Sequence, residues 1–359
     1  MNIVYGVSGE GLGHVFEAIE IGTVLKRDGH NVKVLTYGDR ACDSLGALKP
    51  TRIEGVHLCF NEKGLSLAKT VRKNIGFFPF YLRNARRLIR EIEQFKPDVF
   101  ITAYEPFTMC ASHWLRRPLI SMDNQNELRD LPRPKGASAF AFHLARLTTL
   151  VVTCGAAEYI VKSFSRRGSG TARLHYVAPI IQGEIRRMAV TNGSHVLVYL
   201  TKPNPDLIEV LKSMEGTFIV YCHNRVGEDR NIIYRAQGEN FVRDLASCRA
   251  IIATAGFSLI ADSIFLRKPY FAVPLRKQFE QTHNAHFLGE SGLGEYSEIV
   301  TREALERFLS RLPEYREKLD KYDFDPAEQE ETLRVLLAKI GGRRAADLGT
   351  GVTTTFPGA

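Results

Sequence analysis

Short apolar runs alternate with longer helical patterns along the chain, and the alternation occurs twice. The runs of the first half are MNIVYGV, HNVKVLTY, PDVFITA, RPLISMD and TTLVVTC (1–7, 30–37, 97–103, 117–123 and 148–154). Those of the second half are HVLVYL, TFIVYC, RAIIATA and PYFAVPL (195–200, 217–222, 249–255 and 269–275). Runs that are apolar throughout are typical of parallel strands covered by helices on both faces. The pattern predicts an α/β protein with two doubly wound domains, residues 1–180 and 195–340.

The segments outside these domains have a different composition. The join lies near VAPIIQGEIRRMAVTNGSH, where polar turn residues precede the second set of strands. The last 19 residues, 341–359, read GGRRAADLGTGVTTTFPGA, and we expect this tail to be disordered.

The composition is that of a soluble globular protein, with 44% hydrophobic and 25% charged residues. The six cysteines form no C-x-x-C pair, so neither a zinc site nor a disulfide framework is indicated. The most apolar stretch, 137–161, carries His143, Arg146 and Glu158, and is expected to be a helix followed by the strand at 148–154 rather than a membrane span. With no signal-peptide pattern at the N-terminus, we expect a cytoplasmic protein.

Positive charge is concentrated in the first half of the chain. Residues 1–180 hold 25 Lys and Arg against 16 Asp and Glu, whereas residues 181–359 hold 23 against 24. Residues 63–96 alone contain nine basic and two acidic residues. One basic half indicates an anionic partner or surface on that side.

The first strand is followed by GVSGEGLGH, residues 6–14. A dinucleotide-binding loop, G-x-G-x-x-G, is matched at Gly9 and Gly11, but His14 occupies the third glycine position. A P-loop fails because Leu12 stands where its lysine belongs. The loop lies at the carboxyl end of a strand, where open α/β sheets bind ligands, and His14 can take a proton near neutral pH. A tight turn capped by His14 explains the same residues equally well.

The second half carries a strand, loop, helix and strand in IIATAGFSLIADSIFLRKPYFAVPL. Gly256 and Ser258 stand at the junction of loop and helix, where backbone N–H groups and a hydroxyl can face a phosphate. Asp262 lies one turn further on the same face and is suited to accept hydrogen bonds from ribose hydroxyls. Glu280 and Gln281, after the next strand, pair a carboxylate with an amide, which suits sugar hydroxyls.

On these residues the chain resembles the GT-B glycosyltransferases of the MurG-like branch, over almost its whole length to about residue 340. The resemblance is strongest in GEGLGH, AGFSLIAD and PLRKQFEQTHNA. It implies two facing Rossmann-like domains with a central cleft, the acceptor in the first and a nucleotide-sugar in the second. The donor residues that it implies are Gly11, Gly13, Phe241, Gly256, Ser258, Asp262, Glu280 and Gln281.

Two of these positions depart from the family pattern, and one has a second explanation. Asp262 stands where glutamate is commoner, and Glu280 where some relatives have glutamine. Phe241 occupies the loop that borders uracil in the family, although a phenylalanine there is equally suited to a core position.

Two more strands of the first half end in acidic residues, Glu105 and Asp123. Carboxyl ends of parallel strands meet at one edge, so His14, Glu105 and Asp123 are expected to converge as base and orienting carboxylate. The acidic DFD at 323–325 lies outside the α/β pattern and is not expected to bind a metal.

The sequence thus predicts an inverting, metal-independent hexosyltransferase without a cofactor that uses a nucleotide-sugar, UDP-linked by resemblance. The basic segment 63–96 favours a lipid-linked or anionic acceptor and docking on the inner face of a membrane, or is an ordinary surface helix. Nucleic acid is not expected as a partner. The alternatives are a non-hydrolysing UDP-sugar 2-epimerase and a sugar-nucleotide-binding protein without catalysis.

Overall fold

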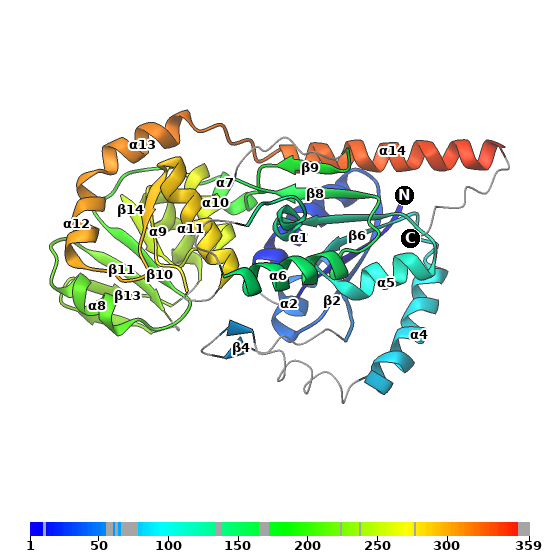
Figure 1. Cartoon of the computed structure of the whole chain (residues 1–359), viewed down its shortest axis with the longest axis horizontal. Coiled ribbons are helices and arrows are strands. Elements are labelled where there is room, and N and C mark those ends of the chain that lie inside the picture. The colour runs from blue at the N-terminus through cyan, green and yellow to red at the C-terminus, as the bar shows by residue number, and fades with distance from the viewer. Residues whose placement is uncertain are drawn as a thin grey trace.

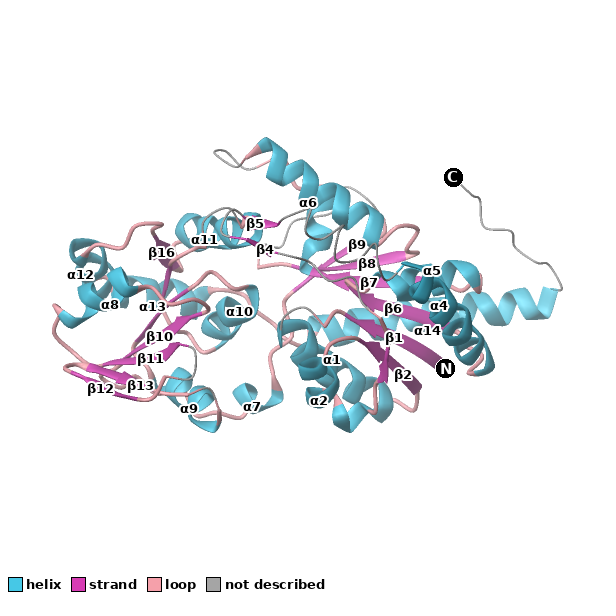
Figure 2. Cartoon of the chain, turned by 90° about the horizontal axis from the view of Figure 1, so that it is seen from below, coloured by secondary structure: helices cyan, strands magenta, loops and turns pink. Residues whose placement is uncertain are grey.

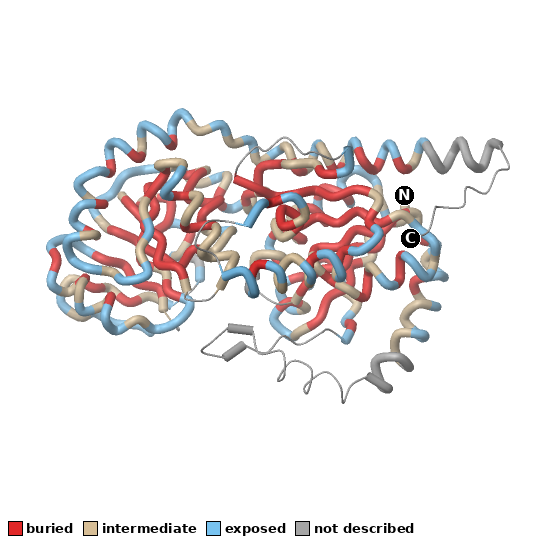
Figure 3. The backbone as a smooth tube through the Cα atoms, in the orientation of Figure 1, coloured by how far each residue is buried: buried red, intermediate tan, exposed pale blue. Residues whose placement is uncertain are grey.

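Two lobes lie side by side along the long axis of the molecule, each built around one sheet (Figure 1). The computed structural model describes residues 1–9, 12–54, 60–61, 64–65, 78–133, 138–164, 172–222, 225–236, 238–275 and 278–350. Buried backbone is concentrated in the two sheets, and exposed backbone in the helices and loops around them (Figure 3). The α/β architecture predicted from the alternation of strands and helices is confirmed.

The sheet of the first lobe has seven parallel strands within the described residues. Their order is β3 (Thr51–Arg52), β2 (Asn31–Thr36), β1 (Asn2–Val7), β6 (Val99–Ala103), β7 (Leu119–Asp123), β8 (Glu158–Lys162) and β9 (Leu174–Val177). Figure 2 shows these strands fanning across the lobe that carries the N-terminus. A separate two-stranded sheet pairs β4 (Phe60–Asn61) with β5 (Gly64–Leu65).

The sheet of the second lobe also has seven strands within the described residues, and β12 runs antiparallel to β13 while the other pairs are parallel. The order is β12 (Gly227–Asp229), β13 (Ile232–Tyr234), β11 (Phe218–Cys222), β10 (Val196–Leu200), β14 (Ala250–Ala253), β15 (Tyr270–Ala272) and β16 (Gly294–Tyr296). Both sheets therefore place the carboxyl ends of their central strands along one edge.

Helices cover both faces of each sheet, which explains why the strands are apolar throughout. In β1, Ile3, Tyr5 and Val7 pack on one side of the first sheet, while Val4 packs on the other. The helices of the first lobe are α1 (Leu12–Arg27), α2 (Asp39–Ser44), η1 (Gly46–Leu48), α4 (Phe78–Gln94), α5 (Pro106–Trp114), η2 (Asn124–Arg129) and α6 (Ala139–Val152). The later helices are α7 (Gly183–Arg186), α8 (Pro205–Lys212), α9 (Glu239–Ser247), α10 (Phe257–Phe265), α11 (Phe279–Ser291), α12 (Arg302–Ser310), α13 (Leu312–Lys321) and α14 (Glu328–Thr350).

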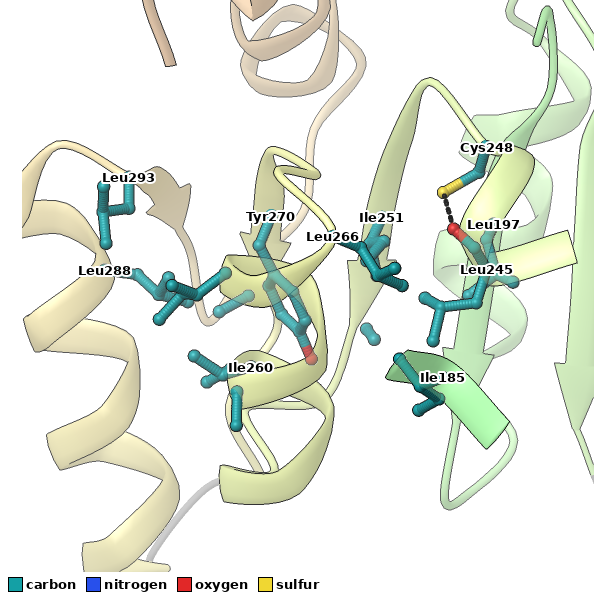
Figure 4. Packing of buried hydrophobic residues seen from close by; sticks show 14 of the residues in the cluster. Ile185, Leu197, Leu245, Cys248, Ile251, Ile260, Leu266, Tyr270, Leu288 and Leu293 are labelled. Atoms are coloured by element: carbon teal, nitrogen blue, oxygen red, sulfur yellow. Dashed lines mark hydrogen bonds between the residues drawn. The ribbon is translucent and has the colours of Figure 1, made fainter. Parts of the chain in front are cut away.

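The core of the second lobe is shown from close by in Figure 4. Tyr270 on β15 is fully buried between α10 and α11, and its hydroxyl donates to the Thr254 carbonyl at 2.6 Å. The buried Cys248 thiol donates to the Leu245 carbonyl at 3.2 Å. Both polar groups thus have hydrogen-bond partners inside an otherwise apolar cluster. The bond from Tyr270 holds Thr254, the first residue after β14, in place.

One predicted strand is wrong. Residues 148–152 continue helix α6, and the strand of this region is β8, which begins at Glu158. The β-branched run favoured a strand, but Thr148 and Thr153 donate their hydroxyls to carbonyls four residues back, as these side chains do in helices. Thr149 is fully buried on the inner face of α6, so tertiary packing overrides the local preference.

The last helix packs on the first lobe, although the rest of the second half forms the other lobe (Figure 1). Leu333, Leu336, Leu337 and Ile340 of α14 join the core formed by β1 and α1. The expected range 195–340 therefore includes a segment that belongs to the first sheet. The helix runs to Thr350 and so includes residues 341–350 of the expected tail, while 351–359 lie outside the described residues.

Much of the basic segment 63–96 lies outside the described residues, including Phe77 and the side chains of 78–83. Helix α4 covers its second part, with Arg86, Arg87 and Arg90 exposed and Ile92 buried against the sheet. None of the helices in the described part of the chain has the length and apolarity needed to cross a membrane.

Candidate active site

His14 and Asp123 form a close pair at the carboxyl edge of the first sheet. His14 is in the first turn of α1, directly after the glycine loop, and Asp123 is the last residue of β7. The His14 Nε2 lies 2.6 Å from the Asp123 Oδ2. The other carboxylate oxygen accepts a hydrogen bond from the backbone N–H of Gln125 at 2.8 Å, so both oxygens of Asp123 are held in place.

The charge state of this pair follows from its surroundings. Asp123 is fully buried; burial raises its pKa, but His14 and Lys162 lower it more, so the carboxyl has a pKa below its usual value. Burial lowers the pKa of His14, yet the charge and hydrogen bond of Asp123 leave that pKa above its usual value. An ionised Asp123 favours the tautomer with the proton on Nε2, which leaves Nδ1 able to accept a proton. The His14 side chain keeps 23% of its surface exposed.

The glycine loop touches the second lobe. A β-carbon on Gly13 would lie 2.7 Å from the Ser258 Oγ, closer than such contacts occur in proteins. Gly13 lies in the first turn of α1 and Ser258 in the first turn of α10, so the starts of these two helices face each other across the lobes. A larger residue at position 13 would therefore displace the Ser258 hydroxyl, while the Ser258 β-carbon, 3.9 Å from the same point, would stay in ordinary contact. Gly11 lies outside the described residues.

Gly256 is the N-cap of helix α10 and has no side chain with which to cap it. Among the described residues, no side chain accepts from the first N–H groups of this helix, as at helix ends that hold anions. Asp262, one turn beyond Ser258, is 6% exposed, and none of the described residues donates a hydrogen bond to its carboxylate. Burial raises the pKa of Asp262 to about 8.

Glu280 links the lobes from the other side of the cleft. It is in the first turn of α11, and its two oxygens accept hydrogen bonds from the side-chain amides of Asn124 at 3.1 Å and Gln125 at 3.0 Å. Burial and the nearby Asp123 raise the pKa of Glu280. The pocket beside this contact is lined from both lobes, by Asn124, Gln125, Glu127, Leu128, Leu131, Phe257, Phe279, Glu280, His283 and Asn284.

Comparisons with known proteins agree with this arrangement of two lobes and a shared cleft. A family model described as glycosyl transferase family 1 matches residues 1–313. The chain belongs to this family. A glycosyltransferase described as uncharacterized, from Methanosarcina acetivorans, is 21% identical to it, over 96% of this chain and 100% of the relative.

Several solved glycosyltransferases share the fold of this family member. The MurG of Acinetobacter baumannii has a TM-score of 0.62 at 15% identity, covering 94% of this chain and 99% of that one. The spinosyn forosaminyltransferase SpnP has a TM-score of 0.63 at 14% identity, with 94% and 99% covered. The glycosyltransferase VinC, in complex with dTDP, has a TM-score of 0.60 at 14% identity, with 96% and 100% covered. The predicted GT-B fold is confirmed, and MurG is among the proteins that share it.

Glu105 does not join the His14–Asp123 pair of this glycosyltransferase. Its fully buried carboxylate caps the N-terminus of α5 and accepts from the Phe107 amide at 2.8 Å and the Thr108 amide and hydroxyl at 2.7 and 2.6 Å. The expectation that three strand ends converge is therefore wrong for Glu105, since its lone pairs are used within its own helix. A β-carbon on Gly6 would lie 2.9 Å from this carboxylate, so β1 packs directly on the cap.

Two predicted donor residues of the glycosyltransferase have structural contacts of their own. The Gln281 Oε1 accepts from the Leu275 amide at 2.9 Å, which fixes the loop between β15 and α11. Phe241 packs edge to face against Tyr199 and Tyr221 with ring centroids 5.6 and 5.0 Å away, and it is partly buried. Both residues therefore support the framework of the second lobe.

Sequence reasoning missed the charged residues beneath the pair. Lys162 ends β8 next to Asp123, and its ammonium contacts Glu17 of α1. Lys162 was not recognised as a residue at a strand end, because the strand of this region was expected to begin at residue 148 and begins at Glu158. Glu127 and His283, 3.3 Å apart, form a further contact between the lobes. Their separation by more than 150 residues gave no signal in the sequence.

Proposed function

We propose that this glycosyltransferase moves a sugar from a nucleotide-sugar, UDP-linked, to an acceptor hydroxyl with inversion at the anomeric carbon. The observation that carries the proposal is the position of the His14–Asp123 pair directly opposite the start of α10. The Gly13–Ser258 contact brings these two parts together. A proton acceptor and an anion-binding helix end then border one cleft, as sugar transfer from a diphosphate requires.

The reaction follows from this arrangement. The acceptor O–H bond breaks as its proton passes to His14 Nδ1, and the freed oxygen forms a bond to the anomeric carbon. The bond from that carbon to the diphosphate oxygen breaks, and the nucleoside diphosphate leaves with the electron pair. Attack opposite the leaving group inverts the configuration. Asp123 stabilises the imidazolium that forms, because its carboxylate is ionised and 2.6 Å from His14 Nε2.

The second lobe is proposed to bind the donor. N–H groups at the start of α10 and the Ser258 hydroxyl face the diphosphate and stabilise its charge as it leaves, so the mechanism is written without a metal ion. Asp262 has a carboxylate with unused hydrogen-bonding capacity one turn away and is assigned to the ribose hydroxyls. Phe241 is assigned to the nucleobase. The solved complex of VinC with dTDP supports a nucleoside diphosphate as the carrier.

Glu280 is assigned to the donor sugar. In the structure its oxygens are hydrogen-bonded to Asn124 and Gln125, which are amides of the acceptor lobe. Sugar hydroxyls offer the same type of donor, so a bound sugar can replace or share these contacts. We propose that the transferred sugar is a hexose.

The acceptor is proposed to approach over the basic first lobe, as a lipid-linked or anionic molecule. Arg86, Arg87 and Arg90 are exposed on α4, and Arg87 is paired with Glu91 at 3.1 Å. The exposed arginines support our proposal that the enzyme docks peripherally on the anionic inner face of a membrane.

Product analysis tests the function. The protein is incubated with UDP-, TDP- and GDP-sugars and with cell extract as the source of acceptor, and products are identified by mass spectrometry. Transfer or slow hydrolysis of one nucleotide-sugar supports the proposal. Interconversion of the donor at carbon 2 identifies the epimerase, and binding without turnover identifies a non-catalytic protein.

A further inference from the structure

Helix α1 presents two titratable side chains to two neighbouring strand ends. His14 and Glu17 are three residues apart and therefore lie on the same face of α1. Strands β7 and β8 are paired side by side and end in Asp123 and Lys162 (Figure 2). His14 contacts Asp123, and Glu17 contacts the Lys162 ammonium. The basic side chains of His14 and Lys162 thus alternate with the carboxylates of Asp123 and Glu17 in one cluster.

The Glu17–Lys162 pair is buried and has further partners. The Lys162 and Glu17 side chains are 6% and 7% exposed. The second oxygen of Glu17 accepts a hydrogen bond from the side-chain NH₂ group of Gln329 on α14. The side-chain oxygen of Gln329 accepts in turn from the backbone N–H of Ile180 at 3.1 Å. A buried ion pair adds little stability compared with an apolar pair of the same size. Its position next to the catalytic pair therefore indicates a function there.

We propose that Lys162 is a positioning residue for the His14–Asp123 pair: a fixed positive charge that, together with Glu17, sets how readily His14 takes the acceptor proton. This inference rests on the proposed function, in which His14 is the base. Lys162 acts through Asp123 and makes no contact with substrate.

The signs of the interactions support this role. Burial opposes the charge of Lys162, but Glu17 and Asp123 raise the pKa of Lys162 above its usual value, so it stays a cation. Lys162 lowers the pKa of Asp123 and of His14, whereas Glu17 raises the pKa of His14. The positive charge of Lys162 and the negative charge of Glu17 therefore act on the pKa of His14 in opposite directions.

Other titratable groups surround the same cluster and must be counted. Glu280 of α11 interacts with both His14 and Asp123. Tyr5 of β1 interacts with Glu17 and Asp123, and Tyr104, after β6, with Asp123 and Glu280. The pKa values of both tyrosines are raised by burial, so they are neutral at the pH of the assay and leave the balance to the acids and Lys162.

The test measures the titration of His14 directly. In protein with ¹⁵N-labelled histidines, the His14 ring signal is assigned by its loss in His14→Asn and followed by NMR against pH. Lys162→Met removes the cation, Lys162→Arg keeps it, and Glu17→Gln removes the anion. The matched control is Glu158→Gln, because Glu158 is at the other end of β8 and also binds α14, through Lys339 at 2.6 Å.

Lys162→Met is expected to raise the pKa of His14 and to shift the acidic limb of the kcat/KM profile to higher pH, with activity lost at neutral pH and recovered as the pH rises. Glu17→Gln is expected to shift both in the opposite direction, while Lys162→Arg and Glu158→Gln leave them in place. If Lys162→Met does not fold, Glu17→Gln carries the test.

Two results would overturn the inference: a His14 titration that is the same in wild type, Lys162→Met and Glu17→Gln, or an equal shift in Glu158→Gln. Failure of the proposed function has a different signature, in which His14→Asn retains full turnover whatever the NMR titration shows.

Discussion

Gly13 and Ser258 belong to different lobes, yet a β-carbon on Gly13 would come within 2.7 Å of the Ser258 hydroxyl oxygen. The Ser258 β-carbon is 3.9 Å from the same point, so the crowding comes from the hydroxyl. This contact brings the start of the helix that carries the base against the start of the helix assigned to the diphosphate.

Gly13→Ala is expected to force the Ser258 hydroxyl out of its position and to weaken UDP binding by about tenfold, or roughly 1.4 kcal/mol. In a Ser258→Ala background, the same change at Gly13 is expected to have little effect on the affinity for UDP. Calorimetry on the four proteins of this cycle measures the coupling between the two residues. Additive effects would show that the two helix starts act independently.

His14→Ala is expected to keep donor affinity and to lower turnover by about a hundredfold or more, which is the usual contribution of a general base. Because the pKa of His14 is raised above its usual value, wild-type kcat/KM should increase with pH until that pKa is passed. Steady-state kinetics from pH 5 to 9 measures both. Weakened donor binding with unchanged turnover would make His14 a binding residue.

Glu105→Ala is expected to reduce stability and not chemistry. The substitution removes the cap of α5 and leaves the Phe107 and Thr108 amides buried without their acceptor, at a cost of about 2 kcal/mol. Urea unfolding measures the loss. At a temperature where the variant is fully folded, its turnover should match wild type, and a hundredfold loss of turnover there would restore Glu105 to the catalytic group.

Asp262→Asn is expected to stabilise the free protein and to weaken UDP binding. The pKa of Asp262 is raised by burial from 3.8 to about 8, so the unfolded chain releases a proton that the folded protein retains. Stability therefore falls as the pH rises between these values, and the substitution should recover on the order of a few kcal/mol at pH 8 and almost nothing below pH 4. Urea unfolding at both pH values, with and without UDP, checks the prediction. Saturating UDP, at about a hundred times its Kd, adds roughly 2.7 kcal/mol to the wild type, and an undiminished gain in the variant would remove Asp262 from the donor site.

Binding to anionic vesicles is expected to be salt-sensitive and lost when Arg83, Arg86, Arg87 and Arg90 are replaced by glutamine. Each basic residue near an anionic surface contributes about 1 kcal/mol, so the four together suffice for reversible docking. Co-sedimentation with phosphatidylglycerol vesicles at low and high salt measures the effect, with neutral vesicles as the control. Equal sedimentation of both proteins, or none of either at low salt, would favour a soluble acceptor.

The fold was predictable because it depends on local patterns. Continuous apolar runs such as β1 and β14 identify buried parallel strands without further information. The polar residues at strand ends were found for the same reason, and the His14–Asp123 pair lies where sheet topology places it. Glu105 and Asp123 both follow a strand and both cap the helix after it. Asp123 uses one carboxylate oxygen for its cap and keeps the other for His14, whereas both oxygens of Glu105 bind amides of α5, and the sequence does not display this difference.

Contacts between distant segments were not predictable. Glu280 meets Asn124 and Gln125 across about 155 residues of chain, and Glu17 meets Gln329 across 312. Such pairs follow from how the lobes and the last helix pack, since no local periodicity records them. The prediction of a strand at 148–154 was wrong because a run of β-branched residues is typical of a strand but also fits a helix when tertiary packing buries residues such as Thr149.

The position of α14 has a consequence for biosynthesis. The strands of the first lobe are translated before those of the second, but the first lobe's core lacks Leu333, Leu336 and Leu337 until the second lobe has been made as well. Gln329 of the same helix completes the charged cluster under His14. A nascent chain that has completed both sheets therefore still lacks part of the core and of the charged cluster of its first lobe until α14 packs against β1 and α1.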